Sequence, residues 1–317
     1  MSPISKGSAA GSGRHTPPRV LAVVGSTAAG KTGLSLDLAE RIGGEIINTD
    51  AMQVYRGMDI GTAKLPPDQR RGIPHHLLDL LDVREAATVA EFQTLARAVV
   101  EDCRDRQVTP VLVGGSALYT RAVVDRFDFP GTDPALRADL ESELEEVGAA
   151  ALHARLGDLD PVAAARIEPR NSRRVVRALE VVALTGRPFT ASLPEPAYVF
   201  KGTVQIGVRI PRPLLHERIE RRVREMWDAG LVAEVRGLAE AGLREGRTAS
   251  RALGYQQVLA FLDGELSEQE ALDRTVTGTR RFARRQQAWF GKDPRVVWVD
   301  WDDPDRLLKT IEAAAPE

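Results

Sequence analysis

The chain has 317 residues, enough for one large domain or two smaller ones, and 43% hydrophobic and 28% charged residues are ordinary for a globular protein. A net charge of −2 excludes a globally basic nucleic-acid binder, so any such surface must be local. The single cysteine, Cys103, excludes an intramolecular disulfide and disfavours a cysteine-rich metal site. Residues 1–18, rich in Ser, Gly and Pro, lack the hydrophobic core of a signal peptide and predict a disordered leader. No apolar run reaches the roughly 20 residues that cross a bilayer, so we expect a cytoplasmic protein.

A phosphate-binding loop follows the leader. An apolar run at residues 20–24 predicts a strand, residues 31–42 predict a helix, and the sequence GSTAAGKT joins them. This strand–loop–helix context is the one that a P-loop requires. Its glycines let backbone N–H groups surround a phosphate, and the following helix directs its positive end at the anion. Lys31 would add a charge and Thr32 a hydroxyl ligand for Mg²⁺. The residues predicted to hold a di- or triphosphate are Gly25, Ser26, Thr27, Ala28, Ala29, Gly30, Lys31 and Thr32.

A second strand is predicted from Glu45 to Asp50, and it ends in a carboxylate. Ligands of parallel α/β sheets bind at the carboxyl ends of the strands. We therefore expect Asp50 to face the space above the P-loop, the alternative being an Asp that only caps the next turn. The polar loop at residues 51–66 predicts a substrate contact or, alternatively, a solvated connector. His75 and His76 have no obvious third metal ligand, so a structural or peripheral role is favoured.

The remaining elements predict an α/β core interrupted by helices. Further buried strands are predicted at 108–113, 203–210 and 296–299, and helices at 87–106 and 213–230. After the first of these strands, Gly114 and Gly115 would allow the close approach of a ligand or a helix. Residues 125–196 contain no alternating strand and predict an inserted helical domain. The core would comprise residues 19–124 and 197–317, with additional helices near the C-terminus.

Two arginine-rich helices are candidates for a nucleic-acid surface. Four arginines of the insertion are three or four residues apart and share one face: Arg170, Arg173, Arg174 and Arg177. That face would contact a phosphate backbone or, alternatively, only solvent. The second stretch, residues 279–291, combines four arginines with Phe282, Trp289 and Phe290. Guanidinium groups beside aromatic rings suit nucleic acid, whereas the alternative is a core helix with a wet basic side.

These motifs resemble the tRNA dimethylallyltransferases, also called tRNA isopentenyltransferases, of the IPP transferase family. The resemblance runs from Ala22 to Asp300 and includes GSTAAGKT, NTDAMQVYRGMDIGTAK, PHHLLD, VGGSALYTRAV, RRVVRALEV, ALGYQQ and TRRFARRQQAWF. No other P-loop family combines these motifs. The family usually has Pro at position 26, often Ser at 29, and more commonly Thr at 116 and 288, where this chain has Ser, Ala, Ser and Ala.

The resemblance implies an activity, a fold and partners. A dimethylallyl group would leave dimethylallyl diphosphate and join N6 of the adenosine immediately 3′ of the anticodon. The fold would be a P-loop NTPase-like parallel sheet, and the enzyme would bind the tRNA anticodon stem-loop. Nothing in the sequence demands more than a monomer. The P-loop would hold the leaving diphosphate together with Mg²⁺ on Thr32 and the arginine Arg222. Asp50 is the expected general base, with Asp59 as the second choice.

The resemblance also implies contacts with tRNA at fifteen positions of this chain. They are Asp50, Ala51, Met52, Gln53, Ser116, Arg173, Arg174, Arg177, Arg251, Gly254, Tyr255, Arg284, Arg285, Gln286 and Trp289. Three other functions compete with this interpretation. A small-molecule kinase shares the P-loop and a strand-end Asp but does not need the arginine-rich helices. An adenylate isopentenyltransferase acts on free nucleotides and does not need the insertion. A nucleotide-dependent RNA-binding protein without transferase activity does not need Asp50.

Overall fold

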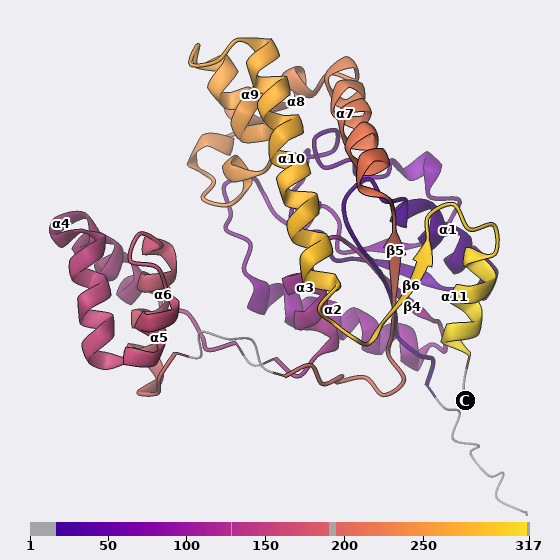
Figure 1. The fold of residues 1–317 in the computed structure, drawn as a ribbon, viewed down its shortest axis with the longest axis horizontal. Helices are drawn as coiled ribbons and strands as arrows, with labels where there is room; N and C mark the ends of the chain where they lie inside the picture. Colours follow the sequence, from indigo (N-terminus) through magenta and orange to yellow (C-terminus); the bar gives the residue numbers. More distant parts are fainter. Residues whose placement is uncertain (1–16, 128, 190–194, 316–317) are drawn as a thin grey trace, which may run out of the picture. The chain divides into compact units, whose positions relative to one another are not determined.

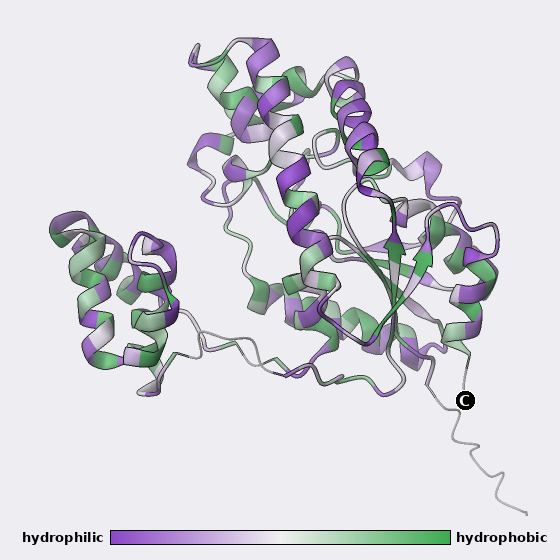
Figure 2. Ribbon diagram, in the orientation of Figure 1, coloured by the Kyte–Doolittle hydropathy of each residue, from purple (hydrophilic) through white to green (hydrophobic). Residues whose placement is uncertain are grey.

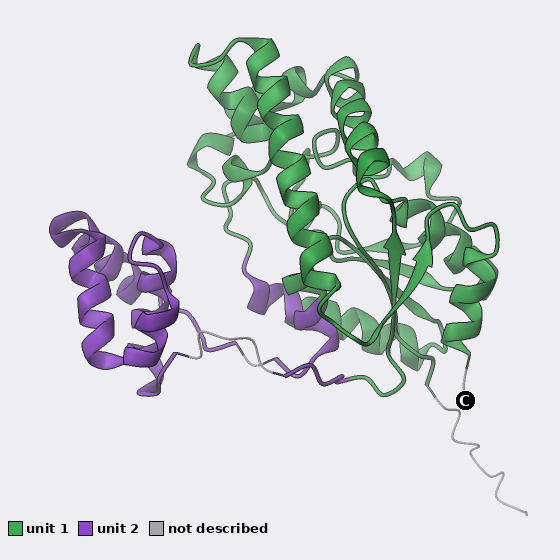
Figure 3. Ribbon diagram, viewed as in Figure 1, with its two compact units in different colours: residues 1–87, 94–120, 200–317 green, residues 88–93, 121–199 purple. Residues whose placement is uncertain are grey.

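The computed structural model describes residues 17–127, 129–189 and 195–315. The chain divides into two compact units (Figure 3): unit 1 comprises residues 1–87, 94–120 and 200–317, and unit 2 comprises residues 88–93 and 121–199. Most of the expected leader, residues 1–16, lies outside the described residues, as do residues 128 and 190–194 of the expected insertion. The described part of the stretch 125–196 falls within unit 2.

Unit 1 is built on a six-stranded sheet with the order β3-β2-β4-β1-β5-β6, in which every neighbouring pair is parallel. Figure 1 shows the neighbouring strands β5 and β6 of this sheet. The strands are β1 (Leu21–Val24), β2 (Glu45–Asn48), β3 (His75–His76), β4 (Pro110–Val113), β5 (Val204–Arg209) and β6 (Val296–Asp300). The wholly apolar β1 is buried along its full length between β4 and β5, as is typical of central parallel strands. The predicted α/β fold with a parallel-sheet core is confirmed.

One side of the sheet differs in detail from the expected elements. β2 ends at Asn48, two residues before Asp50, which therefore lies in the following loop. β3 was not predicted, because two residues are too few to show an alternating pattern. Its residues His75 and His76 pair in parallel with Ile46 and Ile47 of β2.

Helices and a buried apolar cluster complete unit 1. The helices are α1 (Lys31–Ile42), α7 (Arg212–Asp228), α8 (Leu231–Glu240), α9 (Tyr255–Leu262), α10 (Glu268–Phe290) and α11 (Arg306–Ala314), together with α2 (Val89–Asp105), whose first turns belong to unit 2. Leu34 of α1, Ile219 of α7 and Val276 of α10 pack in one cluster with strand residues such as Val23. The rest of α7 is mostly hydrophilic, in contrast to the hydrophobic strands β5 and β6 (Figure 2). Within the described ranges, no helix combines the length and apolar character needed to span a membrane.

Unit 2 is helical. Its helices are α4 (Pro134–Leu159), α5 (Pro161–Arg166), α6 (Ser172–Thr185) and the end of α3 (Ala117–Val124). Side-chain oxygens cap the first three: Asp133 for α4, Asp160 for α5 and Asn171 for α6, the residue types preferred at N-caps. Leu152 and Leu179 belong to a buried apolar cluster of this unit. The unit therefore has a hydrophobic core of its own.

Candidate active site

The P-loop connects β1 to α1 and leaves the start of that helix open. Gly25 and Gly30 have φ angles of 134° and 100°, which favour glycine. A Cβ on Gly25 would also lie 3.2 Å from the carbonyl oxygen of Val208 in β5. Gly30 is the N-cap of α1, and its helix has no side-chain cap. The first amides of α1 have no acceptor within the helix, so they and the positive helix end suit an anion.

Not every amide of the loop is available to a ligand. The Thr27 N–H donates to Gln286 Oε1 at 2.8 Å, and the Ala29 N–H donates to the Ser26 carbonyl at 3.3 Å. The Thr27 and Ala29 amides are therefore engaged within the protein, and the expectation that all eight residues of the loop hold the phosphate stays a prediction. The amides of Lys31 and Thr32, at the start of α1, have no acceptor within the helix and are candidates to donate to a ligand.

Two cations and one carboxylate interact at this edge of the sheet. Burial and, to a smaller extent, the like charge of Arg222 lower the pKa of Lys31 to about 8, while the charge of Asp50 acts in the opposite direction. Burial also lowers the pKa of Arg222, and the charges of Asp50 and Glu225 act against it. Arg222 Nη1 donates to Thr27 Oγ1 at 3.3 Å, which brings α7 onto the P-loop. An anion bound here would relieve the repulsion between Lys31 and Arg222.

Asp50 is held in one orientation by its neighbours. The Asn48 side chain bonds both backbone groups of Asp50: its Oδ1 accepts the Asp50 N–H at 2.8 Å, and its Nδ2 donates to the Asp50 carbonyl at 3.1 Å. The Met52 N–H donates to Asp50 Oδ1 at 2.9 Å. The half-buried carboxylate lines a cavity with the P-loop residues Thr27 and Ala28. Asp50 thus lines the same cavity as the P-loop, as expected, and it also caps the following turn through the Met52 N–H, the role given above as the alternative.

The second choice for the base, Asp59, is engaged elsewhere. Its Oδ1 accepts from Lys64 Nζ at 2.6 Å, and the same nitrogen donates to Asp79 Oδ1 at 2.6 Å and to the Tyr55 carbonyl at 2.9 Å. Lys64 is buried, so this contact fastens the loop. Asp59 does not line either of the two cavities described below.

Two cavities meet at the P-loop. The first, of about 260 Å³, is strongly basic and is lined by Ala28, Gly30, Lys31, Thr32, Arg218, Arg221, Arg222 and Glu225. The second, of about 430 Å³, has a largely apolar wall that includes Ile219, Val223, Met226, Leu253 and Phe282. Ala28 and Arg222 line both cavities. A charged group and an apolar group of one ligand could therefore occupy adjoining spaces.

Comparison of this chain with known proteins identifies one family. Residues 53–293 match the sequence profile described as IPP transferase. The chain belongs to this family. It is 63% identical over 302 residues to a tRNA dimethylallyltransferase of a Nocardioides species, an alignment covering 95% of this chain and 97% of that protein. The resemblance noted from the motifs is thus confirmed.

Two solved structures extend the comparison. The full-length tRNA isopentenylpyrophosphate transferase from Bacillus halodurans is 41% identical, with a TM-score of 0.68, covering 93% of this chain and 94% of that one. A eukaryotic dimethylallyltransferase acting on tRNA is 28% identical, with a TM-score of 0.77, covering 90% of this chain and 74% of that one. The IPP transferase fold therefore covers most of this chain.

In this IPP transferase, the structure brings together about half of the expected tRNA contacts. Seven of them line the second cavity: Asp50, Ala51, Met52, Ser116, Arg251, Gly254 and Arg285. Arg284 and Trp289 are exposed on α10, the helix that carries Arg285. The seven lining residues come from segments far apart in the sequence, so only the fold assembles them.

Three further expected contacts have side chains that are used inside unit 1. Tyr255 is fully buried, and its hydroxyl donates to Glu234 Oε1 at 2.6 Å. Gln286 is only 5% exposed, and Gln53 Nε2 donates to the Thr62 carbonyl at 3.1 Å. In this conformation Tyr255 and Gln286 present no side-chain surface to RNA. The sequence could not reveal this, because the burial of Tyr255 and Gln286 depends on segments that are far from them along the chain.

The arginines of α6 in unit 2 divide in the same way. Arg173 and Arg174 are exposed. Arg177 instead donates to the carbonyls of Pro130 at 2.6 Å and Gly131 at 3.1 Å, and pairs with the buried Glu180 at 2.7 Å. The guanidinium of Arg177 is therefore used in contacts within unit 2. Of the three expected α6 arginines, only Arg173 and Arg174 remain exposed for RNA.

Glu234 in α8 is a residue that the sequence analysis missed. Its carboxylate accepts the N–H groups of Asp59 at 3.1 Å, Ile60 at 2.7 Å and Gly61 at 3.2 Å, as well as the Tyr255 hydroxyl. It thereby fixes the part of the loop that reaches the second cavity at Gly61. No local pattern could have indicated a contact across more than 170 residues.

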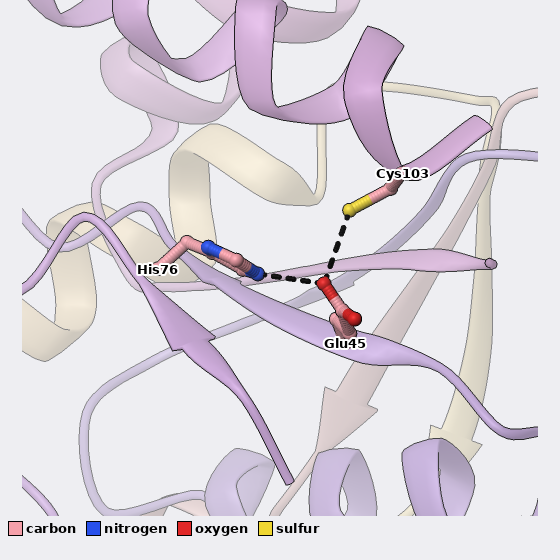
Figure 4. Close-up of side chains that lie close together, drawn as sticks. All are labelled: Glu45, His76 and Cys103. Atoms are coloured by element: carbon pink, nitrogen blue, oxygen red, sulfur yellow. Dashed lines mark hydrogen bonds and ion pairs between the residues drawn. The ribbon is translucent and has the colours of Figure 1, made fainter. Parts of the chain in front are cut away.

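His76 belongs to a cluster with Glu45 and Cys103 at the amino end of β2 (Figure 4). The ligand atoms of these three residues lie within 4.8 Å of one another, which is close enough for a metal ion. However, Arg106 donates to both oxygens of Glu45 at 2.8 Å, and it holds the pKa of that carboxyl near 2. Burial raises the pKa of Cys103 to about 11, so its thiol stays protonated. Arg106 already supplies the cation, and we assign the cluster a structural role.

Proposed function

We propose that the chain transfers a dimethylallyl group from dimethylallyl diphosphate to N6 of the adenosine immediately 3′ of the anticodon in tRNA and releases diphosphate. The observation that carries this proposal is the junction of a basic and an apolar cavity, with Asp50 on the wall of the apolar one and Arg222 on both. The names of the similar proteins, a tRNA dimethylallyltransferase and a dimethylallyltransferase acting on tRNA, support it. A kinase of small molecules would not need the apolar cavity.

The diphosphate fits the first cavity. The amides at the start of α1 would donate to its oxygens, and Lys31 with the three α7 arginines would balance its charge. Charge grows on the diphosphate as the C–O bond to the dimethylallyl group breaks. Groups already directed at that position stabilise the transition state more than the bound substrate.

Mg²⁺ is compatible with the same cavity. Thr32 offers a hydroxyl and Glu225 a carboxylate on its lining, and hard cations prefer oxygen ligands while retaining waters and substrate phosphates. We therefore propose that Thr32 holds Mg²⁺, with Glu225 facing the same space. When bound, the ion would neutralise part of the charge on the leaving diphosphate.

The second cavity suits the apolar group and the adenine. Ile219, Val223 and Met226 lie on one face of α7 and, with Phe282 of α10, form an apolar wall. The adenine must leave the anticodon stack to enter, which costs a few kcal/mol and least for a loop base. Arg251, Arg285 and Ser116 line the same cavity and would contact the flanking nucleotides.

Asp50 would complete the reaction as the general base. When the dimethylallyl carbon bonds to N6, the amine must lose one proton, and the Asp50 carboxylate would accept it. A positioned base contributes typically about 10²–10⁴-fold.

The remaining contacts are proposed for the anticodon stem-loop. Exposed Arg173 and Arg174 of unit 2, and Arg284 and Trp289 of α10, would meet phosphates and bases. We propose that the enzyme acts as a monomer. We propose that this monomer acts in the cytoplasm.

The proposal is tested by incubating the enzyme with Mg²⁺, labelled dimethylallyl diphosphate and either tRNA or free adenine nucleotides, followed by mass spectrometry of the nucleosides. Modified adenosine is expected in tRNA only. Asp50→Asn should lower kcat by about 10²–10⁴-fold while tRNA affinity stays within a few-fold. Asp68→Asn, at an exposed carboxylate, is the control. Label in free nucleotides but not in tRNA would overturn the proposal.

A further inference from the structure

A buried side-chain amide joins the P-loop to the turn after β4. Gln286 of α10 is 5% exposed, its Oε1 accepts the Thr27 N–H at 2.8 Å, and its Nε2 donates to the Gly115 carbonyl at 2.8 Å. A buried group that must both accept and donate can be an amide but not a carboxylate or an apolar chain. The two partners are 259 and 171 residues away along the chain. The contact is therefore a tertiary clamp.

The glycine at position 115 makes room for this clamp. A Cβ on Gly115 would lie 2.2 Å from Gln286 Nε2 and 3.3 Å from its Cδ, whereas the next nearest atom, the Gly25 carbonyl oxygen, is 3.5 Å away. The φ angle of Gly115 is not positive, so an alanine fits the backbone there. The steric demand on this glycine thus comes from the Gln286 amide.

The clamp joins three segments that line the second cavity. That cavity is lined by Thr27 of the P-loop, by Ser116 directly after Gly115, and by Phe282 and Arg285 of α10. With its N–H held by Gln286, Thr27 turns its hydroxyl to Arg222 Nη1 at 3.3 Å. The Gln286 amide therefore fixes the position of Thr27, and through it that of Arg222, relative to the wall of the second cavity formed by α10.

We propose that Gln286 is a positioning residue of the transfer reaction, which acts through Thr27 and Arg222 and not by touching tRNA. This inference rests on the proposed function. Misplacement of reacting groups by about 1 Å can cost about 10²-fold in rate. Loss of the clamp should therefore lower kcat and leave the tRNA-binding surface of α10 unchanged.

The test compares Gln286→Glu, Gly115→Ala and the double variant. Glu keeps an acceptor for Thr27 but cannot donate to Gly115, and the alanine methyl displaces the amide without altering α10. Each single variant should lower kcat by about 10-fold or more with tRNA Kd within two-fold. The double variant should lose little beyond either single one, because residues that act as a unit are not additive. Gln287→Glu, the same change at the next position, is the matched control and should retain kcat.

Three outcomes would overturn the inference: a raised tRNA Kd at unchanged kcat in Gln286→Glu, wild-type kcat in Gly115→Ala, or fully additive losses in the double variant. Circular dichroism and melting temperature identify a variant that fails to fold, and Gly115→Ala then decides alone. If the wild-type enzyme does not modify tRNA, the proposed function fails separately. The clamp is then judged by the affinity for inorganic diphosphate, which both single variants should lower by several-fold and Gln287→Glu should not.

Discussion

Two helices of this chain carry similar arginine triplets and use them differently. In α7, Arg218, Arg221 and Arg222 all line the basic cavity beside the P-loop. In α6, Arg173 and Arg174 are exposed while Arg177 braces two carbonyls and a buried carboxylate. Each triplet spans five positions, so each shares one helix face. The spacing of the arginines identifies the helix face, but the groups packed around that face decide whether its arginines bind a ligand or make structural contacts.

The difference lies in the balance of charge. Burial opposes ionisation of Glu180, but hydrogen bonds from Arg137 and Arg177 lower its pKa, so this carboxylate stays charged and paired. The cavity beside Arg222 is lined by Lys31 and three arginines of α7 but by a single carboxylate, Glu225, so positive charge is in excess there. Excess positive charge in a cavity indicates a site for an anion, whereas matched charges indicate a structural contact.

The largest expected effect is that of removing the α7 charge. Arg222→Ala should lower kcat by about 10²–10³-fold, because Arg222 is proposed to stabilise the charge that grows on the diphosphate. Steady-state kinetics and tRNA binding measure the effect, and tRNA Kd should stay within a few-fold. Arg224→Ala, which breaks only an exposed pair with Glu220, is the control. Equal kcat in the two variants would remove Arg222 from the mechanism.

The corresponding change in α6 should act on stability. Arg177→Ala leaves the buried Glu180 with one ion-pair partner, Arg137, beside the Asp133 N–H that donates to it. We expect a loss of about 2 kcal/mol in unfolding free energy, below the roughly 3–5 kcal/mol of a fully broken buried pair. Denaturant unfolding measures this loss. Arg173→Ala, at an exposed position of the same helix, should change stability by less than about 0.5 kcal/mol. A stable Arg177→Ala with weakened tRNA binding would contradict the role as a brace.

The ammonium group of Lys31, which lines the basic cavity together with the α7 arginines, should titrate. The pKa of Lys31 is about 8, so the ammonium form that binds anions predominates below pH 8 and is lost above it. A bound diphosphate raises that pKa. Diphosphate affinity should therefore fall by up to about tenfold per pH unit above pH 8. Calorimetry at several pH values measures this, and Lys31→Met corrects for titration of the diphosphate itself. An identical pH profile in both proteins would exclude Lys31 as the source.

The smallest effect is expected at the exposed arginines of α6. Arg174→Ala should weaken tRNA binding by several-fold and reduce the slope of log Kd against log salt by about one. Measurements of tRNA Kd at several salt concentrations between about 50 and 200 mM give both the affinity and the slope. Arg236→Ala, at an exposed position of α8 outside the expected RNA contacts, is the control. An unchanged slope in Arg174→Ala would exclude a phosphate contact there.

Much of the fold could be read from local pattern. The helix at residues 31–42 has those same bounds in the structure, and the buried strands after residues 20, 108, 203 and 296 all formed within a few residues of their predicted ends. The apolar runs are long enough to show a pattern, and glycines mark their ends. β3, with two residues held only by pairing with β2, gave no such signal.

The site was predicted in its chemistry but not in its connections. The motif spacing indicated Lys31 and Thr32, and the strand-end position indicated Asp50. The contacts of Glu234 with the loop at Gly61, and of Gln286 with Thr27, join segments more than 170 residues apart and have no counterpart in any local pattern.

The sequence by itself determined the P-loop, the parallel-sheet core and the family, because each depends on residue types at short, fixed spacings. Only the tertiary structure decided which arginines face a cavity and which are braced, because that depends on what packs against each helix. It also showed that Gln286 and Tyr255 are buried and that Asp59 is bound to Lys64. Side-chain burial and pairing are long-range properties, and a helix face that looks uniform in sequence is divided by its neighbours.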